Sequence, residues 1–300
     1  MACPAGGVSV VLGTNFGGKT ALCRLVAGLH GPATGRVTLD GEPLDDLSPG
    51  DRPVALVVQD FVNYPHWTVA QNIASPMRAA GRSAESCGER VAELAATLGL
   101  SDHLNKLPDA LSGGQQQRLA IARALGKEAS VLVMDEPFVN LDYRLRDGLR
   151  DELRALAEQA GLHVLYTTTD PNEALSLADT LTLFSDHTVL QHGAPMALYE
   201  KPVSFAAADL MSDPGVNRLP TGGDDAVVRP EHVLLERSSE RDLCFEFVVE
   251  EAETNGSVTF VHGTVESEPW LVRVPRLFKP EVDSRHEVFV RQSEVLRWTA

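Results

Sequence analysis

Apolar residues in the first two thirds of the chain form short runs that are separated by segments of helical periodicity. Such runs occupy Val8–Leu12, Pro53–Val58 and Val131–Met134, and the stretch His163–Thr169 has a similar β-forming composition. Nearly continuous apolar runs are typical of strands buried on both faces of a parallel sheet. Because strands and helices alternate, the pattern predicts an α/β fold that binds its ligand at the carboxyl ends of the strands.

The segment from about Val69 to Leu125 has the 3.6-residue period of helices. Val91, Leu94, Ala95 and Leu98 share one apolar face. We therefore expect a helical subdomain at about 69–126, inserted between two strands of the main sheet. A further helix is predicted after Pro137, with one apolar face made of Leu141, Leu145, Leu149, Leu153 and Leu156.

The pattern changes again near Met211. Residues 211–225 are rich in turn formers and are predicted to be a linker. Beyond them the apolar runs are short, and Asn255-Gly256 between two such runs is a strong hairpin signal. The sequence thus predicts a first domain at 1–210 and a small all-β domain at 226–300, folded as a barrel or sandwich.

Charge and composition limit the function. The formal net charge is −16 and no stretch of Lys and Arg forms a basic stripe, so a nucleic-acid partner is not expected. The four cysteines have no zinc-like spacing and are predicted to be reduced thiols. No apolar run reaches the roughly 20 residues that span a bilayer, so a connection to a membrane would require a partner protein.

A glycine-rich stretch follows the first predicted strand and opens the first predicted helix. Its sequence, GTNFGGKT from Gly13 to Thr20, has the spacing G-x-x-x-x-G-K-[ST] of a phosphate-binding loop. Backbone N–H groups would surround a polyphosphate, Lys19 would reach the outer phosphates, and the Thr20 hydroxyl would ligate Mg²⁺. An ordinary glycine-rich turn is the alternative, which the flanking strand and helix disfavour.

Three polar residues follow predicted strands. Asp135 is placed to hold the Mg²⁺ shell, and Glu136 to take a proton from an attacking water. Gln59 ends another strand and could ligate Mg²⁺ or orient water through its amide. The alternatives are a solvated acidic loop for Asp135 and Glu136, and a polar strand terminus for Gln59.

The stretch Leu111–Arg118, LSGGQQQR, contains a second element that suits an anion. Ser112 and Gln115 have the spacing of a capping box at the start of a helix that runs to Leu125. The box alone indicates a helix start. Two glycines behind the serine would also expose backbone N–H groups at the positive end of that helix.

Taken together, GTNFGGKT, Gln59, LSGGQQQR, VLVMDEP and NLD resemble the nucleotide-binding subunit of ABC transporters, from the N-terminus to about Pro220. The resemblance implies a RecA-like P-loop NTPase core with a helical subdomain, and a head-to-tail dimer with ATP between the two chains. It assigns ATP binding in cis to Gly13, Thr14, Asn15, Phe16, Gly17, Gly18, Lys19 and Thr20, and completion of the partner's site to Ser112, Gly113, Gly114 and Gln115. Asp142 would link the two sites, and Thr20, Gln59 and Asp135 would contact Mg²⁺.

Further stretches narrow the resemblance. Asn63–Val69 and Gly193–Pro202 are similar to ATPase subunits of carbohydrate and polyol importers, and Val228–His232 resembles an element of their C-terminal OB-like (TOBE-type) regulatory domain. Phe138–Tyr143 and the predicted strand Tyr166–Thr169 look closest to the paired ATPase subunits of glycerol importers. The implied partners are a second ATPase subunit, two transmembrane permease subunits and, indirectly, a solute-binding protein, at the cytoplasmic face of the inner membrane. Tyr64 and Trp67 would either meet the permease or belong to the core of the helical subdomain.

The sequence departs from the family pattern in three places. Thr169 stands where the family has a histidine, and its neutral hydroxyl cannot carry charge toward the γ-phosphate. Residues Met1 to Gly7 contain no aromatic residue to stack on adenine, so either adenine is held weakly or the start site lies further upstream. The spacing from Leu219-Pro220 to Arg229-Pro230 is short for the β-domain of this subfamily.

The sequence therefore predicts an ATPase subunit that powers import of a sugar or polyol, with Glu136, Gln59 and Thr169 as the catalytic residues. Thr169 and the bare N-terminus favour an alternative, an ATP-binding subunit of a heterodimer that hydrolyses ATP weakly. A third hypothesis, an ABC-type ATPase of DNA repair or translation, is disfavoured by the negative charge.

Overall fold

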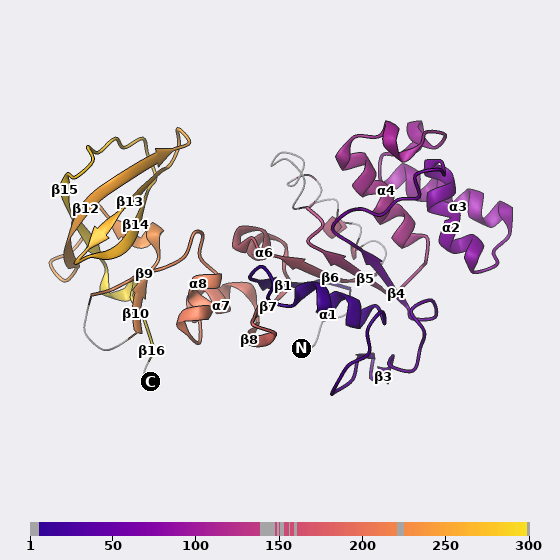
Figure 1. Cartoon of the computed structure of the whole chain (residues 1–300), viewed down its shortest axis with the longest axis horizontal. Helices are drawn as coiled ribbons and strands as arrows, with labels where there is room; N and C mark the ends of the chain where they lie inside the picture. The colour runs from indigo at the N-terminus through magenta and orange to yellow at the C-terminus, as the bar shows by residue number, and fades with distance from the viewer. Residues whose placement is uncertain are drawn as a thin grey trace. The chain divides into compact units, whose positions relative to one another are not determined.

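The structure is a computed structural model of the whole chain, and it describes residues 6–138, 148, 150, 153–155, 157–158, 161–220 and 225–298. The chain divides into two compact units, Met1–Pro195 and Met196–Ala300. Figure 1 shows a mixed α/β unit in indigo to rose and a mostly β unit in orange to yellow. Asp142 and most of the predicted leucine-faced helix lie outside the described residues.

A six-stranded sheet forms the centre of the first unit, in the order β4-β5-β6-β1-β7-β8. All neighbours are parallel except the edge strand β8, which pairs antiparallel with β7. The carboxyl ends of β4, β5, β6 and β1 therefore lie along one edge, as predicted for the ligand site. The strands are β1 (Val8–Gly13), β4 (Val54–Val57), β5 (Val131–Asp135), β6 (His163–Thr168), β7 (Thr180–Ser185) and β8 (Thr188–Gly193).

The helices of this unit fall into two groups. Helix α1 (Lys19–Val26) covers the sheet, and its buried Cys23 packs with Val11, Val133 and Leu165 of three neighbouring strands. The chain between β4 and β5 forms the predicted helical subdomain (Figure 1), with α2 (Val69–Ala79), α3 (Ala84–Thr97) and α4 (Gly113–Leu125), and with short 3₁₀ turns η1 (Ser101–His103) and η2 (Pro108–Ala110). A small hairpin, β2 (Thr38–Leu39) and β3 (Glu42–Pro43), and helix α6 (Pro171–Leu177) complete the unit.

The second unit consists of two antiparallel sheets, in the orders β11-β15-β12-β13-β14 and β16-β10-β9. Its elements are α7 (Pro195–Glu200), α8 (Phe205–Leu210), β9 (Asn217–Arg218), β10 (Asp225–Val228), η3 (Pro230–His232), β11 (Val233–Leu234), β12 (Leu243–Thr254), β13 (Thr259–Val265), β14 (Glu268–Val274), β15 (Arg285–Val290), η4 (Gln292–Glu294) and β16 (Leu296–Trp298). The predicted hairpin turn is confirmed: the Asn255 side chain accepts hydrogen bonds from the backbone of Ser257 and Val258, and Gly256 has a φ of 92°.

The contacts of α7 and α8 explain why the division between the units falls before residue 210. Arg229 donates a hydrogen bond to the Tyr199 carbonyl of α7 at 2.6 Å, Trp298 Nε1 donates to the Pro202 carbonyl between the helices at 2.6 Å, and Arg218 of β9 lies over the Phe205 ring of α8 at 3.9 Å. Both helices therefore fold with the β-strands, whereas the sequence assigns them to the ATPase domain. The segment 211–225, predicted to be a linker, includes β9, which pairs with β10.

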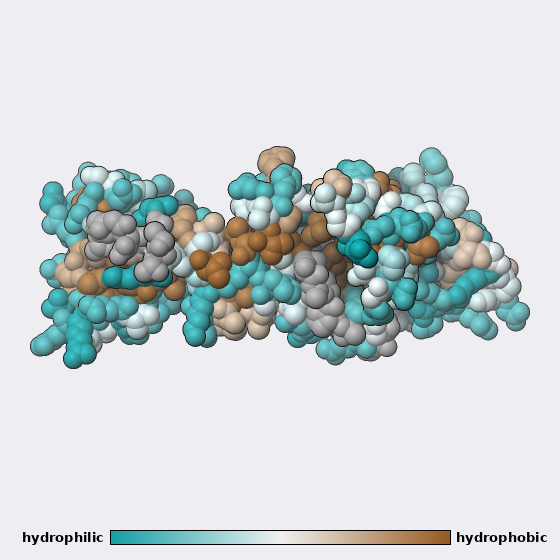
Figure 2. Space-filling view, turned by 90° about the horizontal axis from the view of Figure 1, so that it is seen from below, coloured by the Kyte–Doolittle hydropathy of each residue, from teal (hydrophilic) through white to brown (hydrophobic). Residues whose placement is uncertain are grey.

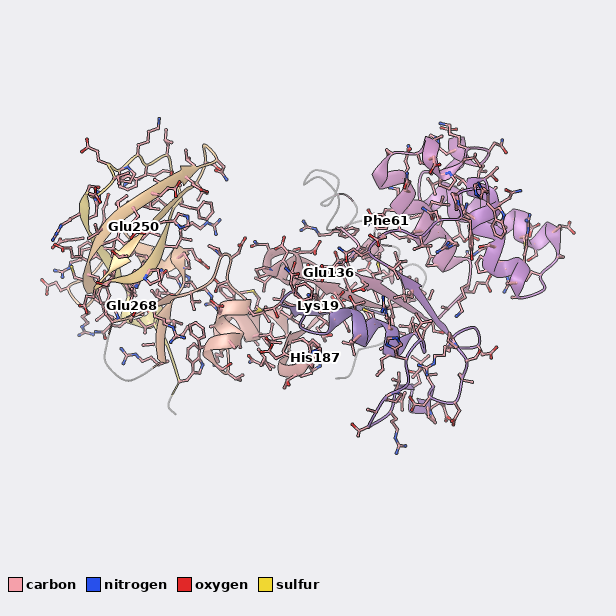
Figure 3. All side chains as sticks on the ribbon, in the orientation of Figure 1. Lys19, Phe61, Glu136, His187, Glu250 and Glu268 are labelled. Atoms are coloured by element: carbon pink, nitrogen blue, oxygen red, sulfur yellow. The ribbon has the colours of Figure 1, made fainter. Side chains whose placement is uncertain are left out.

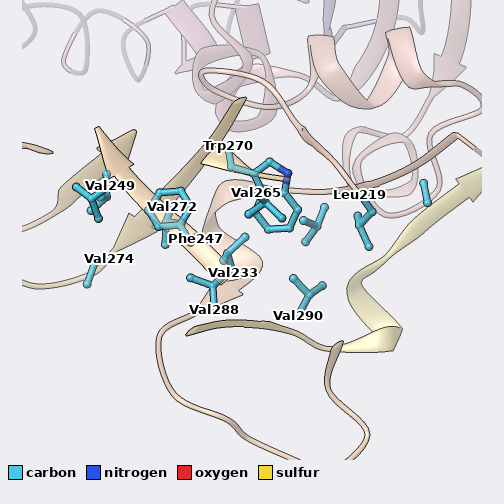
Figure 4. Packing of buried hydrophobic residues seen from close by; sticks show 13 residues of the cluster. Leu219, Val233, Phe247, Val249, Val265, Trp270, Val272, Val274, Val288 and Val290 are labelled. Carbon is cyan, nitrogen blue, oxygen red and sulfur yellow. The ribbon is translucent and has the colours of Figure 1, made fainter. Parts of the chain in front are cut away.

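The core of the second unit lies between its sheets. Phe247, Trp270 and a group of valines from alternate strand positions pack together (Figure 4), as the period of two requires. Gly263 of β13 permits this packing, because a Cβ there would lie 2.6 Å from Cζ of Phe247 and 2.1 Å from the Val248 carbonyl. The alternating apolar pattern of the sequence therefore produces the predicted small all-β unit.

No helix among the described residues is long and apolar enough to span a bilayer. On the face shown in Figure 2, hydrophilic residues (teal) cover much of both units, and hydrophobic residues (brown) gather in smaller areas.

Candidate functional site

The glycine-rich loop joins β1 to α1, as the sequence predicts. Gly18 is the N-cap of α1 with a φ of 102°, and no side chain caps this helix start. Gly13 must be glycine, because a Cβ would lie 2.4 Å from the Phe184 carbonyl of the neighbouring strand. The first N–H groups of α1 therefore have no side-chain acceptor and can receive an anion.

Lys19 is the most constrained residue of this loop. Its side chain is 3% exposed, and Nζ donates to the carbonyls of Gly13 at 2.9 Å and Thr14 at 2.8 Å. The same Nζ lies 3.0 Å from Oε1 of Glu136. The structure thus brings together the predicted phosphate-binding lysine and the predicted general base, which are far apart in the sequence (Figure 3).

The acidic pair at the end of β5 is positioned by Thr167 of the neighbouring strand β6. Asp135 lies opposite Thr167 in the strand register, and the Thr167 hydroxyl donates to Asp135 Oδ1 at 3.0 Å. The Glu136 backbone N–H donates to the same hydroxyl at 3.1 Å. Glu136 has a left-handed φ of 45°, a conformation that is uncommon outside glycine and recurs at functional sites. One threonine therefore holds the Asp135 carboxylate and the Glu136 backbone.

Cys23 of α1 lies buried close to Asp135. The thiol is fully buried in α1, and burial raises its pKa, with a further increase from the negative charge of Asp135. Because the thiolate is the reactive form of cysteine, this thiol is inert in the folded chain.

Thr169 follows β6 and is half-buried beside a carboxylate network. The preceding Thr168 hydroxyl donates to the buried Glu173 carboxylate and accepts from the Asp170 N–H at 3.0 Å. Burial raises the pKa of Glu173, and hydrogen bonds from Thr168 and Tyr166 oppose the increase. These contacts fix the turn that holds Thr169 between the acidic pair on β5 and the loop on β1.

Gln59 lies two residues beyond β4, at the same sheet edge, and is exposed. The loop that follows it is held by Asn72, which is fully buried in α2. Asn72 Oδ1 accepts from the Tyr64 N–H at 2.8 Å, and Nδ2 donates to three backbone carbonyls of the same turn. Asn63 then donates to the Gln116 carbonyl in α4 at 2.9 Å. This loop therefore connects the sheet edge to the helical subdomain.

Ser112 caps α4, and the predicted capping box is confirmed. The Gln115 N–H donates to the Ser112 hydroxyl at 3.4 Å, and the Ser112 N–H donates to Gln115 Oε1 at 3.0 Å. Gly114 is buried, whereas Ser112 and Gly113 are exposed. The segment predicted to be a second anion-binding element thus forms a regular, accessible helix start.

A pocket of about 420 Å³ lies between the sheet and the helical subdomain. Tyr64 and Trp67 line it with their rings 4.5 Å apart, and Arg123 lies over the Tyr64 ring at 5.0 Å. Tyr64 is 45% and Trp67 44% exposed. Of the two alternatives that the sequence leaves open for this pair, the core position does not agree with this exposure.

The chain is similar in sequence to known proteins over most of its length. The family described as "ABC transporter" matches residues 1–139. The alpha-glucoside transport ATP-binding protein AglK of Rhizobium meliloti is 36% identical to this chain, over 89% of this chain and 82% of that protein. The chain belongs to the ABC transporter family.

Other relatives are similar to this chain over comparable lengths. The sn-glycerol-3-phosphate import ATP-binding protein UgpC of Chromohalobacter salexigens is 36% identical over 89% of this chain and 79% of that protein. The spermidine/putrescine import ATP-binding protein PotA of Thermotoga maritima is 31% identical over 96% of this chain and 85% of that protein. The solved structure of cbiO1 from Clostridium perfringens, part of the ABC transporter complex cbiONQ, has a TM-score of 0.62 and 25% identity, over 66% of this chain and 81% of that chain.

The family and fold that the sequence predicts for this ABC transporter chain are confirmed. The roles of the individual site residues remain predictions. Three residues that organise the site were not found from the sequence: Thr167, Asn72 and His187, whose ring lies against the phosphate loop. Each acts through a contact between distant segments, so no local pattern marks it.

Proposed function

We propose that this chain is the ATP-binding and ATP-hydrolysing subunit of an ABC importer for a sugar or a polyol such as glycerol. It would work as a dimer beneath two transmembrane permease subunits, at the cytoplasmic face of the inner membrane, with a solute-binding protein delivering the solute. Relatives named for alpha-glucoside and sn-glycerol-3-phosphate support the solute class.

The observation that carries the proposal is the ion pair between Lys19 and Glu136, with Nζ and Oε1 3.0 Å apart at the uncapped start of α1. A bound γ-phosphate would take Lys19 as its counter-ion and separate it from Glu136. The freed carboxylate could then accept a proton from the attacking water. Without nucleotide, the two charges neutralise each other.

The donor set at the sheet edge suits Mg²⁺. The Asp135 carboxylate, the Thr20 hydroxyl and the Gln59 amide are oxygen ligands, and Asp135 is already oriented by Thr167. Bound there, the ion would neutralise charge on the phosphates. The chain itself supplies Lys19 for the phosphates, Thr169 beside them and Glu136 for the water.

A second copy of the chain would complete each site. Ser112, Gly113, Gly114 and Gln115 lie at a preformed helix start, which suits the γ-phosphate held by a partner. Asp142 is proposed to link the two sites. Closure on ATP and reopening after hydrolysis would drive the permease subunits.

The aromatic pocket is the proposed contact for the permease. Half-exposed Tyr64 and Trp67 are amphipathic rings of the kind found at protein interfaces. Asn72 and Asn63 connect this surface to both the sheet edge and α4. Movement at the nucleotide could therefore reach the permease through this loop.

The test uses Glu136→Gln in the assembled transporter. Steady-state ATP hydrolysis should fall by about 10²- to 10⁴-fold, while ATP stays bound and the dimer becomes stable enough to isolate by gel filtration. Hydrolysis at the parental rate would refute the general-base role. Uptake of labelled glycerol, glycerol 3-phosphate and an alpha-glucoside in cells with and without the chain would test the solute class.

Single-turnover hydrolysis of the assembled complex would separate this proposal from its alternative. A weakly hydrolysing partner subunit, favoured by Thr169, would turn over bound ATP at only one of two sites. The named relatives do not favour that alternative.

A further inference from the structure

Phe16 occupies an unusual position within the phosphate loop. Its side chain is 99% exposed, the highest exposure among the large hydrophobic residues that the structure describes. It also has a left-handed φ of 62°. Exposing a large aromatic ring and placing it at positive φ are both unfavourable, and such residues concentrate where they meet a ligand.

A second ring lies against the same loop. His187 is in the turn between β7 and β8, and it also has a left-handed φ, of 61°. Its backbone N–H donates to the Gly17 carbonyl at 3.0 Å. A Cβ on Gly18 would lie 2.4 Å from Nδ1 of His187. The imidazole therefore lies against the loop, and a larger residue at position 18 would displace it.

The sheet register explains this arrangement. β7 pairs in parallel with β1, and Phe184 lies opposite Gly13, so the turn after β7 meets the loop after β1. Phe16 is bonded to Gly17, whose carbonyl accepts from His187. The backbones of Phe16 and His187 therefore meet at Gly17.

The two ends of the loop differ in charge. Lys19 and Glu136 mark the end that would face the outermost phosphate. In the sheet, β7, which precedes His187, lies on the opposite side of β1 from β5, which precedes Glu136, and the view of Figure 3 agrees with this order. A nucleotide with its γ-phosphate near Glu136 would leave the loop with its nucleoside on the side of His187.

We infer that Phe16 and His187 together bind the nucleoside of the nucleotide, with their planar side chains against the base. This inference rests on the proposed function, since it assumes that the loop binds a nucleoside triphosphate. Aromatic rings stack on the faces of nucleobases with little preference for one base over another. The site would therefore bind a nucleobase without distinguishing its identity.

The test compares two probes on the purified full-length chain by titration calorimetry: ATP, which has a base, and inorganic tripolyphosphate, which has none. Phe16→Leu keeps an apolar side chain but removes the ring. His187→Asn removes the ring with a residue that tolerates positive φ. Each substitution should weaken ATP binding by about tenfold and leave tripolyphosphate binding within about twofold.

Two further variants control for the backbone. Phe16→Tyr should bind ATP with the wild-type affinity, because the aromatic ring is retained. Asp186→Asn, in the same turn and with a φ of 48°, should leave the ratio of the two affinities unchanged.

Equal losses for both probes in Phe16→Leu and His187→Asn would overturn the inference, since the rings would then only shape the loop. Unchanged ATP binding in both would also overturn it. If the wild-type chain binds neither probe, the proposed function fails together with this inference. If it binds both and the ratio never changes, this inference alone fails.

Discussion

Two helices of the first unit begin at glycine-rich segments that the sequence assigns to phosphate binding, and they begin in opposite ways. Helix α1 starts at Gly18 in the left-handed region without a side-chain cap, beside the buried Lys19. Helix α4 starts at the exposed Ser112, with both hydrogen bonds of a capping box. The α1 start has no side-chain acceptor for its N–H groups, whereas the α4 capping box pairs the N–H groups of Ser112 and Gln115 within its own first turn.

This difference indicates which start depends on a ligand. The N–H groups at the start of α1 need an external acceptor. Lys19 forms an ion pair with Glu136 and donates hydrogen bonds to two loop carbonyls. The start of α4 is already stable, since a serine cap contributes about 1 kcal/mol. We therefore expect α1 to change when nucleotide binds and α4 to present a fixed surface to a nucleotide held by another chain.

The largest effect is expected from Lys19→Ala. Removing the counter-ion of the phosphates should weaken ATP binding by at least about 100-fold, measured by calorimetry on the isolated chain. Lys127→Ala is the matched control, because Lys127 Nζ also donates to two backbone carbonyls, at 2.9 Å each, but outside the loop. Similar affinities for the two variants would contradict the special position of α1.

Ser112→Ala should separate the two starts. We expect a loss of about 1 kcal/mol in unfolding free energy and unchanged ATP affinity of the single chain, but a fall of about tenfold in hydrolysis by the assembled transporter. Ser83→Ala removes the corresponding cap of α3, where Ser83 accepts from the Ser86 N–H at 3.2 Å. That control should lose stability and keep hydrolysis, so equal hydrolysis in both variants would argue against a role of α4 in a partner's site.

A smaller effect is expected from Thr169→His. An imidazole at the turn after β6 can carry charge toward the γ-phosphate, which the threonine hydroxyl cannot. Turnover of the assembled transporter should rise severalfold while ATP affinity of the isolated chain stays the same. An unchanged turnover would mean that residue 169 does not limit hydrolysis at the α1 site.

The smallest effect is on pH dependence. Burial raises the pKa of Glu173 in the folded chain. Its contribution to stability is therefore fully present below the ordinary carboxyl pKa and is lost as pH rises through the higher folded value. Urea unfolding at several pH values should show that the stability difference between wild type and Glu173→Gln shifts in favour of the variant as pH rises. A difference that does not vary with pH would refute this account of the turn that holds Thr169.

The sequence predicted those parts of the site that depend on neighbouring residues. Strand, loop and α1 follow from one contiguous stretch, and the Ser112–Gln115 spacing alone gave the capping box, because a cap is a contact over three residues. The helical subdomain and the hairpin at Asn255-Gly256 were predicted for the same reason.

Contacts between distant segments could not be predicted. The ion pair of Lys19 with Glu136 and the orientation of Asp135 by Thr167 depend on the order and register of β5, β6 and β1. The placement of α7 and α8 with the β unit depends on Arg229 and Trp298, which are distant in sequence. Single residues such as Thr167 have no distinctive neighbours, so their role appears only when the strands are paired.

The buried thiol of Cys23 offers a chemical readout of this site. Among the cysteines that the structure describes, Cys244 is exposed, whereas Cys23 and Cys87 are buried. Alkylating reagents should therefore modify Cys244 first and reach Cys23 only when α1 separates from the strand that carries Asp135. The rate of Cys23 labelling, measured by mass spectrometry, would report how often α1 separates from this strand. Bound nucleotide should slow the labelling of Cys23.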